Sequence, residues 1–237
     1  MLLEVSNLNT YYGQSHALQD MTLNVAQGEV VALLGRNGMG KSTTLKSIMG
    51  LLKPSSGKVV FNGREITGLQ PYKVARAGIG YVPEERRIFP NLSVMDNLMM
   101  GVKGGKINNS DPEAWSIEKI FRHFPFMKER THQKGAHLSG GEQQMLTIGR
   151  TLMGNPKLLM VDEPTEGLSP IMVKEVRDVL KQISESGISI LLVEHNLKMA
   201  MSIAHRVYLM GKAHLGFSGT VAELEANAEA KAKYLEV

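Results

Sequence analysis

The sequence predicts an α/β fold in which helices cover a mainly parallel sheet. Three short hydrophobic runs end at a glycine or an acidic residue, and each is followed by a helical pattern; they occupy 30–34, 158–161 and 188–193. Strands buried on both faces form such continuous runs. Alternation of strands with helices favours a parallel sheet. We therefore expect one α/β domain over residues 1–237.

The beginning of the chain departs from this pattern. Residues 2–34 contain short alternating strand segments, and turn residues punctuate the region at Gln27-Gly28 and, further along, at Asn62-Gly63. Alternation between turns is typical of antiparallel strands. We expect an antiparallel β portion beside the parallel sheet.

Apolar residues at helical spacing follow the first two hydrophobic runs. Spacings of three and four residues place them on one face of a helix. The first set is Leu45, Ile48, Met49 and Leu52, and the second is Val173, Val176, Leu180 and Ile183. Both segments are predicted to be helices that pack on the sheet.

The segment of roughly 88–156 has helical periodicity and few strand signals, so it is expected to form an inserted helical subdomain. The core is then roughly 1–87 and 157–237. A loop at 101–111, rich in glycine, asparagine and lysine, is predicted to be mobile. One helical face includes Trp115, Ile120, Phe121 and Phe124.

Composition narrows the class of protein. The chain is 43% hydrophobic, which suits a packed core, and it has no cysteine for disulfides, thiol chemistry or cysteine metal sites. Its net charge is +4, but charges of both signs are interspersed and aromatic residues are only 5%, so a nucleic-acid surface is not expected. No apolar run approaches the roughly 20 residues that cross a bilayer. The first residues do not resemble a signal peptide.

A glycine-rich loop, GRNGMGKS at 35–42, lies between a predicted strand and a predicted helix. It matches G-x-x-x-x-G-K-[ST], in which backbone N–H groups and the helix N-terminus bind phosphate. Lys41 is expected to neutralise phosphate charge and Ser42 to bind Mg²⁺. The alternative is a turn that only caps a helix. The residues predicted to bind ATP here are Gly35, Arg36, Asn37, Gly38, Met39, Gly40, Lys41, Ser42 and Thr43.

Two carboxylates, Asp162 and Glu163, follow the second hydrophobic run. In open α/β sheets, ligands bind at the carboxyl ends of the strands. Asp162 can hold Mg²⁺ through water, and Glu163 can orient or deprotonate the water that attacks a phosphate. The alternative is a pair of surface acids, or a helix N-cap before Pro164.

A signature segment, LSGGEQQ at 138–144, has the pattern of a helix start. Ser139 and Glu142 have capping-box spacing, so a helix is expected to begin here. A capped helix needs no ligand. Two adjacent glycines, however, are costly in a simple cap and would allow close approach of a phosphate to the backbone.

Together these motifs resemble those of the nucleotide-binding subunits of ABC transporters, and the resemblance covers essentially the whole chain. It implies a P-loop NTPase, RecA-like core that binds ATP and Mg²⁺. It also implies that two such domains pair head to tail. The signature residues Ser139, Gly140, Gly141 and Glu142 would then face the ATP that the partner's glycine-rich loop binds.

The resemblance extends to single residues. Tyr12 corresponds to the aromatic residue that stacks on adenine, with Tyr11 as the neighbouring alternative and a plain strand aromatic as a third reading. His195 corresponds to the switch histidine that would contact the γ-phosphate, although a histidine at a strand end is often structural. Glu163 and His195 are the predicted catalytic residues.

Two positions depart from the family pattern. Glu84 stands where the family usually has a glutamine that senses the γ-phosphate and Mg²⁺; a carboxylate can still approach Mg²⁺ but adds negative charge beside a polyanion. Ser169 stands where many members have aspartate. The predicted metal ligands are Ser42, Asp162 and Glu84.

Further resemblance, in YVPEERRIFPNLSVMDNL at 81–98 and LLVEHN at 191–196, is to ATPase subunits of branched-chain (hydrophobic) amino-acid importers. The resemblance implies a second ATPase subunit, a distinct paralogue or a second copy, together with membrane permease subunits and, indirectly, a substrate-binding protein. Glu85, Arg86, Arg87 and Phe89 are candidate permease contacts, or a solvated charged run. The implied location is cytoplasmic, at the inner face of the cell membrane.

Three alternatives remain open at this level. Urea and short-chain amide importers have closely similar ATPase subunits. A soluble ABC ATPase of repair or translation usually has a coiled coil or two tandem cassettes, for which this length leaves no room. A small-molecule kinase would need an acceptor site and would have no use for the signature segment.

Overall fold

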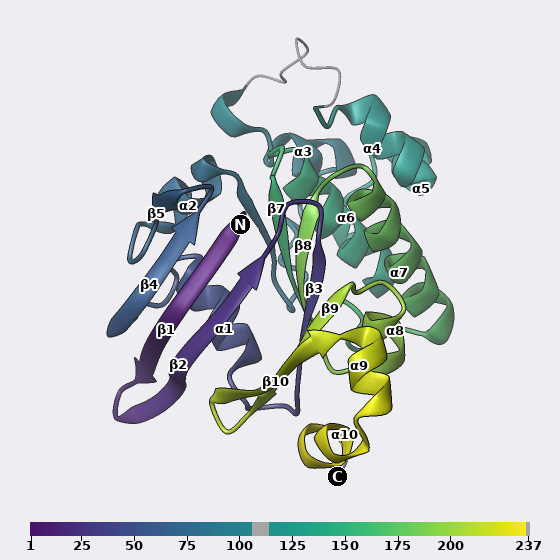
Figure 1. Ribbon diagram of the computed structural model, residues 1–237. Coiled ribbons are helices and arrows are strands. Elements are labelled where there is room, and N and C mark those ends of the chain that lie inside the picture. The colour runs from purple at the N-terminus through teal and green to yellow at the C-terminus, as the bar shows by residue number, and fades with distance from the viewer. Residues whose placement is uncertain (106–113, 236–237) are drawn as a thin grey trace.

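The computed structural model describes residues 1–105 and 114–235, and two sheets form its framework (Figure 1). The larger sheet has the order β10-β9-β3-β8-β7-β6. Its strands pair in parallel, except that the edge strand β10 is antiparallel to β9. They span Val30–Leu34 (β3), Ile79–Val82 (β6), Leu158–Asp162 (β7), Ser189–Glu194 (β8), Arg206–Gly211 (β9) and His214–Thr220 (β10). The three predicted hydrophobic strands are β3, β7 and β8.

The smaller sheet is antiparallel, which confirms the predicted β portion. Its order is β2-β1-β4-β5, and the turn at Asn62-Gly63 joins its last two strands. The strands span Leu3–Tyr12 (β1), Ser15–Val25 (β2), Ser56–Phe61 (β4) and Arg64–Glu65 (β5). This sheet therefore extends further along the chain than residues 2–34.

Alternate residues of the central strands contribute to two hydrophobic cores. Val31 and Leu33 pack with Leu45 and Ile48 of α1 (Lys41–Ile48) and with the antiparallel sheet. Ala32 and Leu34 face the other core, which α6 (Gly140–Leu152) and α7 (Pro170–Glu185) cover. Figure 1 shows α1 on the side of the small sheet and α7 on the opposite side. The parallel sheet is thus covered on both faces, as its hydrophobic runs predict.

Between β6 and β7 the described residues form helices and no strand, in agreement with the helical character predicted from the sequence. Ile120 and Phe124 lie buried there in the same core as α6 and α7. The subdomain limits of 88–156 stay a prediction, and residues 106–111 of the loop predicted to be mobile lie outside the described part. The elements are α3 (Val94–Met99), η1 (Lys103–Gly105), α4 (Ile117–His123), α5 (Pro125–Glu129), η2 (Gly135–His137) and α6 (Gly140–Leu152).

The remaining helices flank the sheet and end the chain. A terminal helix at roughly 220–237 is expected from the sequence, but the structure divides it at Asn227, whose side chain accepts a hydrogen bond from Ala230 N at 2.9 Å. None of the helices that the structure describes is long and apolar enough to cross a membrane. The bounds are Pro71–Ala77 (α2), Pro170–Glu185 (α7), Leu197–Met201 (α8), Val221–Ala226 (α9) and Ala228–Tyr234 (α10).

The strand order brings the predicted motifs to one edge of the parallel sheet. β8 lies between β3 and β7, with Leu34 paired to Glu194 and Asp162 paired to Val193. The carboxyl ends of these three strands therefore meet. The glycine-rich loop after β3 lies beside the segments that follow β7 and β8, where open α/β sheets bind ligands.

Candidate functional site

The glycine-rich loop curls tightly before α1. Gly40 is the residue before the helix and has φ 103°. A Cβ there would lie 2.7 Å from Ala17 O and 2.6 Å from Met210 Cε, so only glycine fits between β2 and β9. Lys41 reaches back across the loop, and its Nζ donates to Arg36 O at 3.1 Å. The loop is therefore held closed by its own lysine.

A buried ion pair joins this loop to the end of β7. Lys41 Nζ lies 3.0 Å from Glu163 Oε1, and both side chains are buried. The other oxygen of the carboxylate, Glu163 Oε2, lies 3.1 Å from His195 Nδ1. Glu163 thus connects two predicted site residues, the lysine and the histidine.

The backbone at Glu163 is unusual. Its φ is 42°, in the left-handed region that non-glycine residues rarely adopt. Glu163 N donates to Val193 O at 2.9 Å, which holds this conformation against the neighbouring strand. Strained backbone of this kind is concentrated at functional sites. A carboxylate aimed by its backbone, with a histidine on its other side, can orient or deprotonate a water molecule.

Asp162 lies beside the first residues of α1 and offers oxygen ligands. Its Oδ1 accepts from Ser42 Oγ at 2.8 Å and its Oδ2 from Tyr81 OH at 2.9 Å. Burial raises the pKa of Asp162, while the hydrogen bonds from Ser42 and Tyr81 oppose the rise. Burial, followed by the contact with Asp162, raises the pKa of the Tyr81 hydroxyl.

This donor set fits Mg²⁺. A hydroxyl and a carboxylate lie side by side, and Mg²⁺ prefers such oxygens, usually with one or two protein ligands plus phosphates and water. In the described ranges no three His, Asp or Glu side chains form a metal cluster. A site that relied on phosphate oxygens for the rest of its ligands would need no such cluster.

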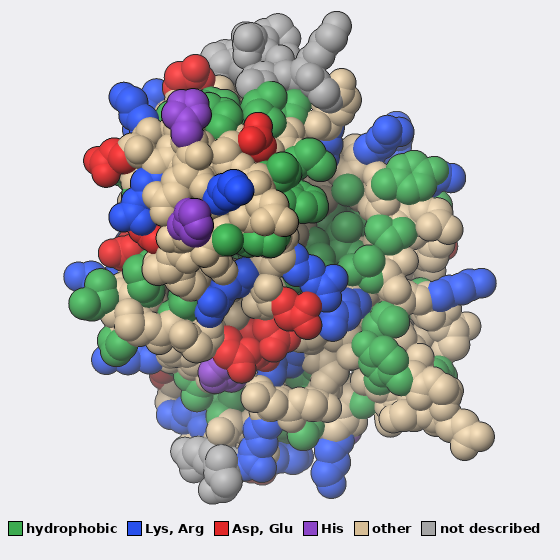
Figure 2. All heavy atoms as spheres, turned by 180° about the vertical axis from the view of Figure 1, so that it is seen from behind, with side chains coloured by type: hydrophobic (Ala, Val, Ile, Leu, Met, Phe, Trp, Pro, Cys, Tyr) green, Lys and Arg blue, Asp and Glu red, His purple; other side chains and the backbone are tan. Residues whose placement is uncertain are grey.

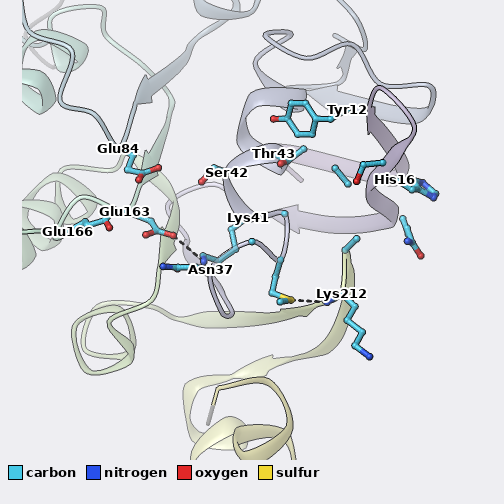
Figure 3. Close-up of a pocket in the computed structure, with 17 residues that line it drawn as sticks. Tyr12, His16, Asn37, Lys41, Ser42, Thr43, Glu84, Glu163, Glu166 and Lys212 are labelled. Atoms are coloured by element: carbon cyan, nitrogen blue, oxygen red, sulfur yellow. Dashed lines mark hydrogen bonds and ion pairs between the residues drawn. The ribbon is translucent and has the colours of Figure 1, made fainter. Parts of the chain in front are cut away.

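A cavity of about 650 Å³ opens over the glycine-rich loop (Figure 3), which is within the size range of small-molecule sites. Gly35, Arg36, Asp162 and His195 do not line it, although Arg36, Asp162 and His195 contact residues that do. The predicted residues that line it are Tyr12, Asn37, Gly38, Met39, Gly40, Lys41, Ser42, Thr43, Glu84 and Glu163.

The structure separates the two tyrosine candidates. Tyr11 stacks on His16, with ring centroids 4.1 Å apart and planes 6° apart, and does not line the cavity. Tyr12 lines it with 48% of its surface exposed. An open aromatic face at a cavity rim can stack on a nucleobase.

Acidic side chains line the side of the cavity opposite Tyr12. Lys41 and Ser42 belong to the loop in the middle of Figure 3. Glu84, Glu163 and Glu166 lie on one side of that loop, and Tyr12 lies on the other. The pKa of Glu84 is raised by burial, then by its hydrogen bond with Glu166 and by the charges of Glu166, Glu163 and Asp162. Glu84 thus lies among other carboxylates, and its effect on a bound polyanion stays a prediction.

The signature segment does not reach this cavity. None of residues 139–142 lines it. Ser139 is the N-cap of α6, and a capping box with Glu142 is present, as predicted. Glu142 also pairs with Arg130, with Oε1 and NH1 2.8 Å apart.

Both signature glycines have close neighbours within the chain. A Cβ at Gly140 would lie 2.5 Å from Arg86 NH1, and one at Gly141 would lie 2.3 Å from Met172 Cε. Ser169, at the second departure from the family pattern, is the N-cap of α7 and accepts from Met172 N at 3.4 Å. Both glycines thus lie against side chains of the same chain, and Ser169 has a capping role of its own.

Sequence reasoning missed several residues of this region. Tyr81 and Glu166 contact predicted site residues, and Lys212 lines the cavity. Glu194, the last residue of β8, is fully buried beside His195. Tyr81 and Glu194 lie near the carboxyl ends of β6 and β8, but the sequence does not distinguish them from other residues at strand ends.

Sheet order, the glycine-rich loop and the paired carboxylates place this chain in the class of P-loop NTPases. Residues 18–166 match the family model described as ABC transporter. The chain belongs to that family and is an ATPase of it.

Similar proteins extend over almost the whole chain. It is 39% identical to BraG of Pseudomonas aeruginosa, a high-affinity branched-chain amino acid transport ATP-binding protein, covering 99% of each chain. It is 32% identical to LptB of Escherichia coli, a lipopolysaccharide export ATP-binding protein, covering 98% of this chain and 96% of LptB. A solved dimer of the ATP-binding cassette MJ0796, bound to ADP and Pi, is similar with a TM-score of 0.79 at 25% identity, covering 92% and 98%.

Proposed function

We propose that this ATPase powers the uptake of branched-chain or other hydrophobic amino acids, as one of two cassettes that hydrolyse ATP between them. The observation that carries the two-cassette proposal is the separation of the two phosphate-directed motifs. Residues of the glycine-rich loop and Glu163 line the cavity, whereas residues 139–142 do not. A second cassette, with its own signature segment, would complete the site. The MJ0796 structure, a dimer bound to ADP and Pi, supports this arrangement.

Each residue has a role in the proposed reaction. The loop amides and Lys41 bind the phosphates, and Tyr12 stacks on adenine. Mg²⁺, held through Ser42, Asp162 and Glu84, would neutralise charge that develops on the phosphates. Glu163 orients the attacking water and accepts its proton, and His195 holds Glu163 and the terminal phosphate in line. Ser139 and Gly141 serve the partner's nucleotide.

The permease subunits would bind near the loop that follows β6. Phe89 is 42% exposed there, and Leu51 and Met100 are also exposed. Arg87 and Glu85 form an exposed ion pair, with NH2 and Oε2 2.8 Å apart. Figure 2 shows hydrophobic side chains in a hollow on one face, bordered by charged ones. An aromatic residue beside arginines suits an interface core, and such docking would hold the chain at the inner face of the membrane.

One substitution tests the two-cassette proposal. Glu163→Gln should bind ATP without hydrolysing it and therefore accumulate as an ATP-dependent dimer or heterodimer in light scattering, with ADP giving no dimer. The double variant Lys41→Ala/Glu163→Gln should stay monomeric, because it lacks the lysine that binds the phosphates of ATP. A Glu163→Gln chain that binds ATP but stays monomeric, even with its native partners, would refute the arrangement.

The transported solute needs a separate test. The tagged chain should co-purify with multi-spanning membrane subunits, and the reconstituted complex should hydrolyse ATP faster with a binding protein loaded with leucine, isoleucine or valine. Stimulation by urea or a short amide instead would assign the chain to that importer class. The 32% identity to LptB makes an export assembly the third outcome. Retention on ribosomes or DNA would contradict transport.

A further inference from the structure

Glu194 is a buried carboxylate that the proposed reaction does not use. It is the last residue of β8, and its exposed fraction is 0%. Burying a charged group is costly unless hydrogen bonds replace its lost hydration. The hydrogen-bond donors to this carboxylate therefore indicate its role in the fold.

Two loops share the two oxygens of this carboxylate. Oε1 accepts from the backbone N–H of Thr165 at 3.1 Å and from the Thr165 hydroxyl, both in the loop that follows β7. Oε2 accepts from His195 N at 2.9 Å and from Asn196 N at 2.7 Å, in the loop that follows β8. Each oxygen thus holds one loop.

These are the loops that carry the predicted catalytic pair. Thr165 lies two residues after Glu163, whose strained backbone is also tied to β8 through Val193 O. His195 is bonded through its own backbone N–H. The distance of 3.1 Å between Glu163 Oε2 and His195 Nδ1 therefore depends on two segments that one carboxylate fixes relative to each other.

We propose that Glu194 is a positioning residue, a clamp that aligns Glu163 with His195 for hydrolysis. The inference rests on the catalytic roles proposed above for these two residues. None of the hydrogen bonds to Glu194 comes from the glycine-rich loop. Loss of the clamp should therefore slow hydrolysis and leave nucleotide binding intact.

Glu194→Gln is the sharpest change because it preserves the size of the side chain. All four hydrogen bonds to Glu194 need an acceptor, and an amide replaces one oxygen by an NH₂ donor. Whichever way the amide turns, at least one backbone N–H loses its acceptor. Misplacing catalytic groups by about 1 Å can cost roughly a hundredfold. We expect kcat to fall by roughly ten- to a hundredfold, because the clamp is weakened and not removed.

Thr165 supplies a second variant that leaves the carboxylate in place. Thr165→Val removes only the hydroxyl donor, so kcat should fall in the same direction but less. Thr165→Ser keeps both donors and should lose less than Thr165→Val. The double variant Glu194→Gln/Thr165→Val should be less impaired than the product of the single effects, because both act on one contact.

A matched control acts on stability alone. Glu29 is a partly buried acid that precedes β3, at the opposite edge of the sheet, and its Oε1 lies 2.8 Å from Arg206 Nε. Glu29→Gln should lower the melting temperature and leave kcat per folded molecule unaltered. It separates a general loss of stability from a loss of alignment.

The experiment measures kcat and KM of the full-length chain, under conditions in which the wild type hydrolyses ATP, and the Kd of a fluorescent ATP analogue. A drop in kcat with unaltered Kd, absent in Glu29→Gln, supports the clamp. A Glu194→Gln kcat within about twofold of wild type, or a Kd that weakens as much as kcat falls, overturns it. If Glu163→Gln itself still hydrolyses ATP, the proposed catalytic roles fail and the clamp fails with them. If Glu163→Gln is inactive and Glu194→Gln is not, the clamp alone is wrong.

Discussion

The glycine-rich loop and the signature segment both place glycines at a helix start, but the chain holds them differently. The loop curls over a cavity of its own, and Lys41 crosses it to reach Glu163. The signature segment caps α6 and packs its glycines against Arg86 and Met172, away from that cavity. The first motif lines a cavity within its own chain, and the proposed second cassette would complete that site. The second begins a capped helix outside that cavity, where the proposed partner's nucleotide would bind.

Removing the lysine should produce the largest effect. Lys41→Ala leaves the buried Glu163 carboxylate without its cation, and breaking such a pair costs about 3–5 kcal/mol of unfolding free energy. Nucleotide binding should be lost as well. Urea denaturation and a fluorescent ATP analogue measure the two effects. The control is Lys58→Ala, because its pair with Glu65 is exposed and worth about 1 kcal/mol or less. If Lys41→Ala retained its nucleotide affinity, the glycine-rich loop would not be the phosphate-binding element that distinguishes it from the signature segment.

The second-largest effect is expected at the side of the cavity where adenine would bind. Tyr12→Ala should weaken nucleotide binding by about 1–3 kcal/mol, the range for base stacking on aromatic side chains. Tyr11→Ala is the matched control, because its ring stacks on His16 and should affect stability more than affinity. Binding titrations with both variants decide the point. Equal losses of affinity would show that Tyr12 has no special role.

On the signature side, Ser139→Ala should have two separable effects. Loss of the N-cap should lower the unfolding free energy by about 1 kcal/mol. The nucleotide affinity of the chain's own cavity should stay unaltered, whereas ATP-dependent dimerisation should weaken. Thr220→Ala removes the same type of capping box from α9 and is the control for cap loss. If Ser139→Ala weakened binding to its own cavity, the two motifs would not be separate in one chain.

The smallest expected effect concerns pH. The pKa of Glu84 is raised from 4.5 in the folded chain by burial, Glu166 and nearby charges. A raised folded pKa gives stability that is present at low pH and lost as the pH rises through the folded pKa. Glu84→Gln should therefore be more stable than wild type at neutral pH, and the difference should disappear below about pH 4.5. Melting curves between pH 4 and 8 provide the measurement; a difference that does not vary with pH contradicts it.

Sequence reasoning predicted the framework because local patterns determine it. Buried strands such as Val30–Leu34 are continuous hydrophobic runs, and a capping box marks the start of α6. Tyr11 and Tyr12 could not be separated, since β1 has register shifts between Leu8 and Tyr11 that re-aim the side chains. No local pattern records that shift.

Contacts between distant segments were the other limit. Glu194 looks like an ordinary strand end, and its partner Thr165 lies far away in the chain. The tail appeared continuously helical because alanine, glutamate and lysine favour helices, yet Asn227 caps a second helix there. In both cases the deciding interaction involves a side chain whose acceptor role depends on where other segments lie.

Lys41 has a finite number of hydrogen bonds to give. An ammonium group has three donors, and Arg36 O and Glu163 already accept from or pair with this one. One donor is left for a phosphate. A second bond to that phosphate requires either Arg36 O or Glu163 to release the lysine. If Glu163 releases it, tighter phosphate binding and the loss of the buried ion pair occur together, and the proposed base then has one carboxylate oxygen without its cation.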